Sequence, residues 1–142
     1  IPDNVYIIGT MNDIDRSVDS FDFAMRRRFR FIEIKAEETT TMWQGQLDDT
    51  KIEEATNRLI ALNKQIADTD DLNSNYHIGP SYFLKLPELY YNYDVLWTDY
   101  LQPLLEEYLR GNYEEQKKLD AMKNAYDLTD QTNEENADED RR

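Results

Sequence analysis

The stretch VYIIGTMNDIDRSVDSFDFAMRRRFRFIEI, residues 5–34, decides how the first part of this chain folds. It opens with a continuously apolar run, VYII, of the kind found in strands that are buried on both faces of a parallel sheet. A polar loop follows, then a short amphipathic segment that ends in three arginines, and residues 29–34 predict a second strand. Two strands alone are marginal in water. We therefore expect their sheet neighbours to lie upstream in a longer protein, or in an arrangement particular to this chain.

Beyond residue 35 the pattern is helical. The clearest helix carries an apolar stripe at spacings of three and four, formed by Ile52, Ala55, Leu59, Leu62 and Ile66. From the amino end, the predicted helices are a short one through Trp43, a long one capped by residues 48–50, one around residues 82–84, one over residues 93–109 and a more polar one over residues 113–128.

Two local signals refine this helical part. Pro103 lies inside the predicted helix 93–109 and should kink it or begin a new segment, and Gly111 and Asn112 are typical of a helix end. The apolar face of that helix is predicted from a spacing of four, which joins Leu96, Tyr100, Leu104 and Tyr108.

The fold class that follows is an α/β fragment plus an α-helical bundle, mostly α. Residues 1–36 would be the last part of an α/β core domain, residues 37–128 a small helical subdomain, and residues 129–142 a disordered acidic tail. Residues 1–4, IPDN, carry no initiator Met and no signal-peptide features. We therefore expect the chain to be cut from a longer cytoplasmic protein.

Composition excludes several classes of function. The formal net charge is −14, so the chain as a whole repels nucleic-acid phosphates. It has no cysteine, which excludes disulfides and thiolate metal sites, and with His77 as the only histidine we expect no metal site. No apolar run approaches the roughly 20 residues that a membrane span needs.

Three short motifs in the first stretch carry a family resemblance: TMN at residues 10–12, DRS at 15–17 and AMRRRF at 24–29. Together they resemble the second half of an AAA+ nucleotide-hydrolysing domain. More narrowly, they are similar to the McrB group, the motor subunit of bacterial 5-methylcytosine-dependent restriction systems, whose pattern is close to TMNxxDRSxxxxDxAxRRRFxF. The later IGPSYF, residues 78–83, resembles the lid region of that group, with Pro80 where we expect His. The resemblance covers residues 5 to about 110.

The resemblance implies roles for the polar residues of the loop. Asn12 matches the sensor-1 position, which senses the γ-phosphate and orients the attacking water. Asn12 and Asp15 together match an Asn-x-x-Asp signature associated with the group's nucleotide chemistry. The group uses GTP and most AAA+ relatives use ATP; because Asp13 and Ile14 stand where the group commonly has Thr and Ala, the base preference stays open here.

The arginines and the later turn also receive roles from the resemblance. Arg27 and Arg28 match arginine-finger positions, which act on nucleotide held by the neighbouring subunit, and Arg16 would support that interface. A guanidinium is always charged and can bind a phosphate with two hydrogen bonds, so it suits this task. His77 and Gly79 are the candidate nucleotide-binding residues of the lid. The lid turn itself contains no arginine, which leaves Arg58 and Arg110 as the remaining candidates for a sensor-2 role.

For the full protein, the resemblance implies GTP or ATP with Mg²⁺, a ring oligomer expected to be a hexamer, and DNA translocation for a separate McrC-like nuclease subunit. DNA would be bound through other parts of the protein. The chain contains neither GxxxxGK[ST] nor an apolar strand that ends in Asp-Glu. We therefore expect this chain alone to be inactive.

Each of these features also has a plainer interpretation. Asn12 and Asp15 occur often in ordinary capped turns. The arginine cluster could be a solvated helix end or a nucleic-acid patch, and His77 a packing residue. The tyrosines of residues 90–108 are more typical of a core and its rim than of a stacking platform for bases. The acidic tail could serve only to keep the chain in solution, or it could contact a basic partner.

Two alternative functions stay open for the whole chain. It could be part of an ATP-using AAA+ protein of another branch, or a non-enzymatic helical interaction module.

Overall fold

The computed structural model describes residues 2–11 and 27–129. The chain divides into two compact units, Ile1–Glu33 and Ile34–Arg142. The predictions for Asn12, Asp15 and Arg16, and for the tail beyond residue 129, concern residues outside those that the structure describes.

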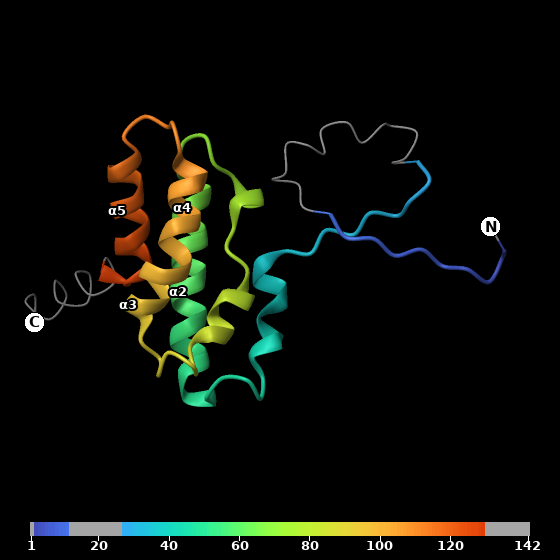
Figure 1. Ribbon diagram of the computed structural model, residues 1–142, viewed down its shortest axis with the longest axis horizontal. Coiled ribbons are helices and arrows are strands. Elements are labelled where there is room, and N and C mark those ends of the chain that lie inside the picture. The colour runs from blue at the N-terminus through green and yellow to red at the C-terminus, as the bar shows by residue number, and fades with distance from the viewer. Residues whose placement is uncertain (1, 12–26, 130–142) are drawn as a thin grey trace, which may run out of the picture. The chain divides into compact units, whose positions relative to one another are not determined.

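The described part of the first unit contains no strand (Figure 1). Residues 2–11 form a turn, in which the Val5 N–H donates to the Pro2 carbonyl at 3.1 Å, followed by extended backbone. The two segments predicted as strands, 5–10 and 29–34, are not strands here, and their apolar side chains are exposed, Ile8 by 93% and Ile32 by 72%. A strand is stable only when it is paired with a neighbouring strand and one face is covered. The described residues of these two segments form no strand ladder and leave their apolar side chains exposed.

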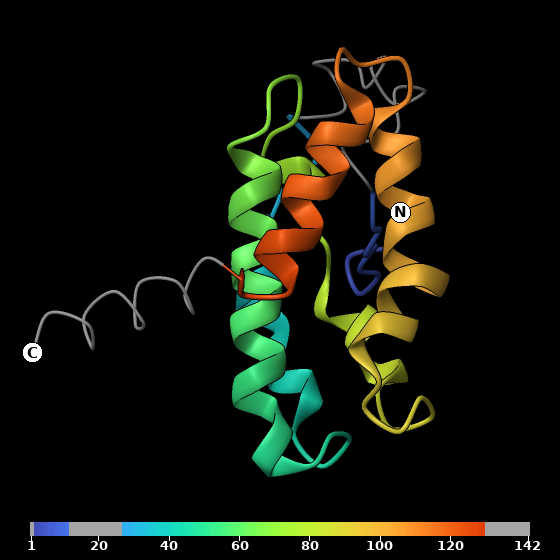
Figure 2. The same ribbon diagram turned by 90° about the vertical axis from the view of Figure 1, so that its left-hand side faces the viewer.

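The second unit is a helical bundle. Its helical elements are η2 (Ala36–Trp43), α2 (Asp49–Ala67), η3 (Ser74–Tyr76), η4 (Pro80–Lys85), α3 (Tyr93–Leu96), the π-helical turn η5 (Trp97–Leu101), α4 (Gln102–Leu109) and α5 (Glu115–Tyr126). Helix α5 packs against α2 and α4, and η2 packs against η4 (Figures 1 and 2). No helix among the described residues is long and apolar enough to cross a membrane.

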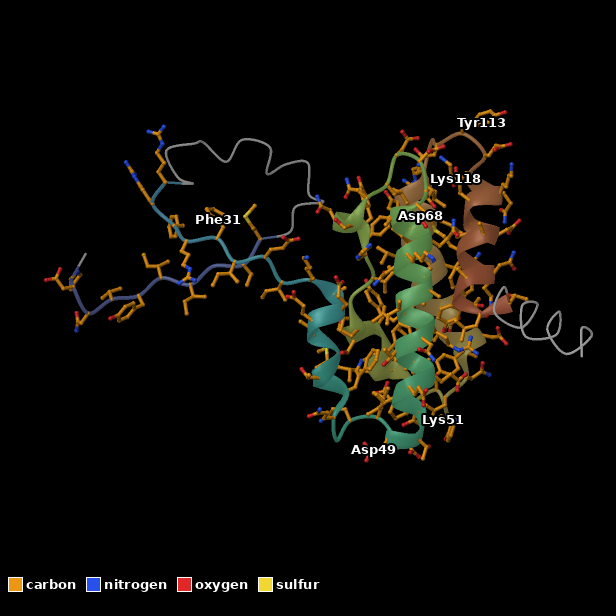
Figure 3. The ribbon with its side chains drawn as sticks, turned by 180° about the vertical axis from the view of Figure 1, so that it is seen from behind. Phe31, Asp49, Lys51, Asp68, Tyr113 and Lys118 are labelled. Atoms are coloured by element: carbon orange, nitrogen blue, oxygen red, sulfur yellow. The ribbon has the colours of Figure 1, made fainter. Side chains whose placement is uncertain are left out.

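Helix α2 is the central element of the bundle. Asp48 caps it, because the Asp48 carboxylate accepts the Thr50 N–H at 2.9 Å, as predicted for residues 48–50. The predicted stripe faces the core: Ala55, Leu59, Leu62 and Ile66 are at most 1% exposed, and Ile52 packs at its edge. Figure 3 shows Asp49 and Lys51 at one end of α2, with Asp68 and Lys118 near the other. There the Lys118 ammonium donates to the Asp70 carbonyl at 3.3 Å, which ties α5 to the loop after α2.

The helix predicted over residues 93–109 is three consecutive segments. The Gln102 N–H donates to the Trp97 carbonyl, five residues back rather than four. Pro103 has no N–H to continue the ladder, so a π-helical turn next to it fits the predicted interruption. The turn inserts an extra residue, and the fully buried positions become Leu101, Leu105 and Leu109. Of the predicted face, Leu96 is fully buried, whereas Tyr100, Leu104 and Tyr108 pack half-buried at the edge of the core.

The connection between α4 and α5 follows the predicted helix end. Gly111 has a φ of 81°, a left-handed conformation that glycine adopts without steric cost, and the Asn112 N–H donates back to the Leu109 carbonyl at 2.8 Å. Helix α5 then starts at Glu115, and its Leu119, Met122 and Tyr126 side chains enter the core. The resulting bundle holds one apolar core, whose buried members all lie between residues 43 and 126.

Candidate functional site

Two of the predicted catalytic residues lie in the described part of the chain. Arg27 and Arg28 form a turn at the start of the second described segment, and both side chains are exposed. Exposed guanidinium groups can reach a phosphate supplied from outside the chain, and each offers several N–H donors in a planar fork. Their surroundings within the first unit are therefore compatible with an anion ligand that comes from elsewhere.

The turn predicted to face nucleotide in the lid, residues 77–80, is held by a buried amide. Asn63 lies on α2 and is 6% exposed. Its Oδ1 accepts the Ile78 N–H at 2.7 Å, and its Nδ2 donates to the Ile78 carbonyl at 3.0 Å. One side chain thus satisfies both backbone groups of Ile78, which is itself 1% exposed.

A second side chain fixes the other end of the same turn. The Trp43 indole, fully buried, donates from Nε1 to the Pro80 carbonyl at 2.8 Å, and its ring centroid lies 5.6 Å from that of Phe83. Pro80 begins η4, where its fixed φ suits a first helical position and its missing N–H costs no bond. Proline at this place is therefore accommodated by the fold.

His77 and Gly79 flank the anchored Ile78. The His77 ring is half-buried, and its Nε2 is buried without a hydrogen-bond partner among the described residues. Because this nitrogen has almost no accessible surface, a ligand could bond to it only if neighbouring side chains shifted. A Cβ added at Gly79 would meet only the Ser81 Oγ, at 3.7 Å, so the backbone is approachable on that side. The Gly79 backbone is therefore the part of this turn that a ligand can approach.

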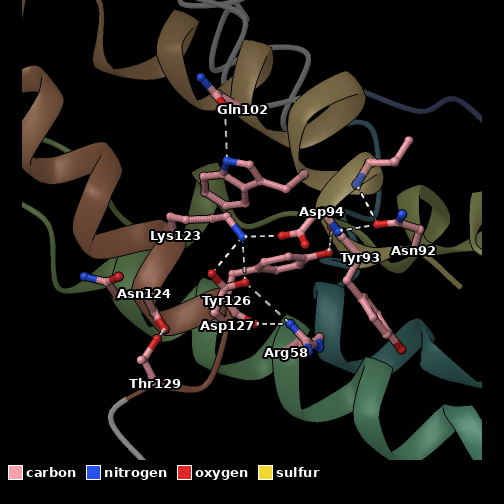
Figure 4. A network of polar contacts seen from close by, with 12 residues as sticks. Arg58, Asn92, Tyr93, Asp94, Gln102, Lys123, Asn124, Tyr126, Asp127 and Thr129 are labelled. Carbon is pink, nitrogen blue, oxygen red and sulfur yellow. Dashed lines mark hydrogen bonds and ion pairs between the residues drawn. The ribbon is translucent and has the colours of Figure 1, made fainter.

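Arg58 and Arg110, the two other candidates for a lid arginine, already have partners in the bundle. Arg58 pairs with Glu54 at 3.0 Å. It also pairs with Asp127 at 3.6 Å, donates to the Tyr126 carbonyl at 3.1 Å, and stacks 4.2 Å from the centroid of the Tyr93 ring (Figure 4). Arg110 is 75% exposed and pairs with Glu107. The geometry gives Arg58 a structural role.

The network around Arg58 joins three helices (Figure 4). The Lys123 ammonium pairs with Asp94 at 3.1 Å and with Asp127 at 2.7 Å, and the Tyr126 hydroxyl donates to the Tyr93 carbonyl at 2.9 Å. Burial raises the pKa of Tyr126, and it raises the pKa of Tyr93 to about 12. This network fixes the end of α5 to α2 and α3.

Sequence reasoning did not find Asn63 or Trp43. The sequence did contain a signal for Asn63: it lies on the apolar side of the predicted helix, beside Leu62, and a buried amide needs hydrogen-bond partners there. Trp43 gave no comparable signal, because its bond to Pro80 joins residues 37 positions apart.

The described part of the second unit is an α-helical bundle, and part of it matches a known family. Residues 54–117 match the model of the family described as the McrB alpha-helical lid domain. The chain is also 35% identical, over 130 residues, to the "Type IV methyl-directed restriction enzyme EcoKMcrB subunit" of Escherichia coli (strain K12). That match covers 82% of this chain and 28% of the relative. No solved structure matches the chain.

Residues 54–117 therefore belong to the McrB lid-domain family, and the resemblance to the McrB group is confirmed. The helical part of the predicted fold class is confirmed with it, whereas the α/β strands are not formed by the described residues.

Proposed function

We propose that this chain is part of the motor subunit of a McrB-type restriction system, an AAA+ protein that hydrolyses GTP or ATP and drives DNA translocation. The observation that carries the proposal is the agreement of the lid-family match with the identity to the E. coli subunit. The chain spans 28% of that relative's length, so the phosphate-binding lysine and the acidic Mg²⁺ ligands would come from the rest of the protein.

In this proposal the residues around the first loop act on the phosphate. When bound, the nucleoside triphosphate with Mg²⁺ supplies the phosphoryl group that is transferred to water. The amide of Asn12 can hold a phosphate oxygen and the attacking water at once, because it is neutral and both donates and accepts hydrogen bonds. Asp15 completes that element, and Arg16 supports the subunit interface.

Arg27 and Arg28 would act on the nucleotide of the neighbouring subunit. Their exposure in the first unit supports this role, because a finger that works in trans has to reach beyond its own chain. Fingers of this kind contribute about 10³–10⁵ in rate. Hydrolysis would then depend on assembly of a ring, proposed to be a hexamer, which would act with a McrC-like nuclease subunit.

The lid turn of residues 77–80 would contribute to the nucleotide site in its own subunit. The open space beside the Gly79 backbone supports this placement. The side chains of this turn carry no formal charge other than that of a protonated His77. We therefore propose that it contacts the base or the sugar rather than the phosphates.

The direct test measures phosphate release by the full-length protein that contains this chain, with GTP and with ATP, each with Mg²⁺. We expect turnover of one or both nucleotides by the full-length protein and none by residues 1–142 alone. Turnover by the isolated chain that depends on Arg27 would overturn the proposed division of the site. Absence of turnover in the full-length protein would favour a non-enzymatic interaction module.

A mixing experiment tests the trans arrangement. Full-length Asn12→Ala subunits lack a residue of their own site, and Arg27→Ala/Arg28→Ala subunits lack the residues offered to a neighbour. Each homogeneous ring should be inactive, and a mixture should regain turnover because some interfaces combine an intact Asn12 with intact arginines. Arg30→Ala, a change at another exposed arginine of the same segment, is the matched control and should remain active. No recovery on mixing would place Asn12 and the arginines in one subunit's site.

A further inference from the structure

The amide of Asn63 has an arrangement that packing alone does not require. It stands on the buried side of α2, between Leu59 and Ile66, where an aliphatic side chain would fill the core. Instead it forms two hydrogen bonds with Ile78, one to the N–H at 2.7 Å and one to the carbonyl at 3.0 Å. This pairing copies the way in which a neighbouring strand would hold an extended residue.

Only a primary amide can serve Ile78 in this way. Aspartate at position 63 could still accept from the N–H but could not donate to the carbonyl, and leucine could do neither. Ile78 is 1% exposed, so water cannot replace the missing partner, and buried backbone groups left unsatisfied are costly. The position of Ile78 relative to α2 is therefore fixed by Asn63.

Trp43 provides an independent anchor for the same turn. Its Nε1–H donates to the Pro80 carbonyl at 2.8 Å from the opposite end, out of η2. Ile78 and Pro80 are thus both held, by side chains that lie 15 and 37 positions away in the sequence. Gly79 lies between the two fixed residues, and His77 lies directly before them. Asn63 and Trp43 therefore determine the position of Gly79, whose backbone a ligand can approach, and of the neighbouring His77.

We propose that Asn63 and Trp43 are positioning residues for nucleotide binding: they hold residues 77–80 in the geometry that binds the base or sugar, without touching the nucleotide themselves. This inference rests on the proposed function of the lid turn. A displaced turn would weaken binding of the ground state and the transition state alike. The expected kinetic signature is therefore a raised KM with an unchanged kcat.

The two tryptophans of the chain allow a matched test. Trp43→Phe removes the hydrogen bond to the turn and keeps an aromatic ring in the core. Trp97→Phe likewise removes one indole hydrogen bond, which goes to the Gln102 Oε1 at 3.1 Å in another part of the bundle. Asn63→Asp and Thr69→Val form a second pair, since Thr69 is a buried polar residue of the loop after α2 whose bond goes only to the Gln65 carbonyl.

The experiment measures KM and kcat for GTP and for ATP in the full-length protein and its four variants. We expect Trp43→Phe and Asn63→Asp to raise KM roughly tenfold while kcat stays within about twofold, since small misplacements of a binding group have effects of this size. Trp97→Phe and Thr69→Val should leave KM unchanged. A variant that merely unfolds lowers the active fraction and hence the apparent kcat, so it cannot imitate this result.

Two outcomes refute the inference, and they can be told apart. If the unsubstituted protein hydrolyses nucleotide but Trp43→Phe shifts KM no more than Trp97→Phe, the positioning role is wrong and the proposed function stands. If the unsubstituted full-length protein neither binds nor hydrolyses GTP or ATP, the proposed function fails and the inference falls with it.

Discussion

Arg58 is a charged residue whose side chain is only 17% exposed, and its partners account for its burial. The guanidinium donates to the Glu54 carboxylate and to the last carbonyl of α5, and its flat face lies over the Tyr93 ring. A largely buried charge is tolerated when hydrogen bonds and opposite charges replace the water that it loses. Arg58 therefore connects α2 to the end of α5.

The stability contribution of this residue can be measured directly. Arg58→Met should lower the free energy of unfolding by about 2–3 kcal/mol, because it leaves the Tyr126 carbonyl without its partner and removes charge-assisted bonds. Arg110→Met should cost less than about 1 kcal/mol, since Arg110 is 75% exposed and pairs only with Glu107. Urea denaturation of the chain, followed by circular dichroism, gives both values. Equal small losses would show that the network adds little stability.

The tyrosines beside Arg58 make the bundle sensitive to alkaline pH. Burial raises the pKa of Tyr93 to about 12 in the folded chain, above its ordinary value near 10. The folded chain therefore keeps a proton that the unfolded chain loses. This contribution is fully present below pH 10 and is lost as the pH rises through about 12. Urea denaturation between pH 8 and 11.5 should show stability falling above about pH 10.

Two variants assign this pH dependence. Tyr93→Phe should make the decline shallower, and near pH 7 it should cost little, because the Tyr93 hydroxyl is buried without a partner among the described residues. Tyr113→Phe, at a side chain that is 82% exposed, should leave the profile unchanged. A decline that is identical in wild type and Tyr93→Phe would contradict the assignment.

At the scale of the elements, the sequence predicted what depends on local periodicity. The Ile52–Ile66 stripe and the Asp48 cap located α2 closely, because both signals act within one helix. The shift of the buried face to Leu101, Leu105 and Leu109 was not predicted, since Pro103 signalled an interruption but not its form as a π-helical turn. The anchors of the lid turn were missed because they join residues that only the packed bundle brings together.

The turn before α3 has a strained left-handed backbone at Tyr90 and Tyr91, and at Tyr91 this conformation supports a side-chain hydrogen bond. The Tyr91 N–H donates to the Leu86 carbonyl at 2.8 Å, the closing bond of a Schellman-type turn, and Tyr90 and Tyr91 have φ angles of 51° and 57°. Tyr91 gains from this conformation, because its hydroxyl accepts the Asp48 N–H at 2.6 Å. Tyr90 is 93% exposed and occupies the position where glycine is preferred.

Glycine at position 90 should therefore stabilise the bundle. The left-handed conformation costs a residue with a Cβ about 1–2 kcal/mol, and part of the gain is offset by the greater freedom of glycine in the unfolded chain. Tyr90→Gly should raise the free energy of unfolding by about 0.5–1 kcal/mol. Tyr113→Gly is the control: that residue is similarly exposed without a positive φ, and the change should destabilise. A destabilising Tyr90→Gly would reveal contacts of the Tyr90 ring that offset the strain.

At the scale of the whole molecule, the two units differ in what covers their apolar residues. The bundle buries its own, and its fully enclosed residues range from Trp43 to Tyr126. In the first unit, Tyr6, Ile7 and Ile8 are 88%, 61% and 93% exposed. Consecutive exposed apolar residues with strand-type side chains are what a sheet segment presents when its neighbours are not there to pair with it.

Hydrogen exchange in the isolated chain and in the full-length protein tests whether residues 5–8 become a strand. In the isolated chain their amides should exchange almost as fast as in an unfolded peptide, because the described backbone there has no sheet partner. The proposed AAA+ core would pair these amides in the full-length protein and slow their exchange by at least about 100-fold. The Ile78 amide, bonded to Asn63 in the bundle, should be protected in both and serves as the internal control. If residues 5–8 stay unprotected in the full-length protein while Ile78 is protected, the lid is correctly assigned but the strand that should carry Asn12 to the phosphate does not exist.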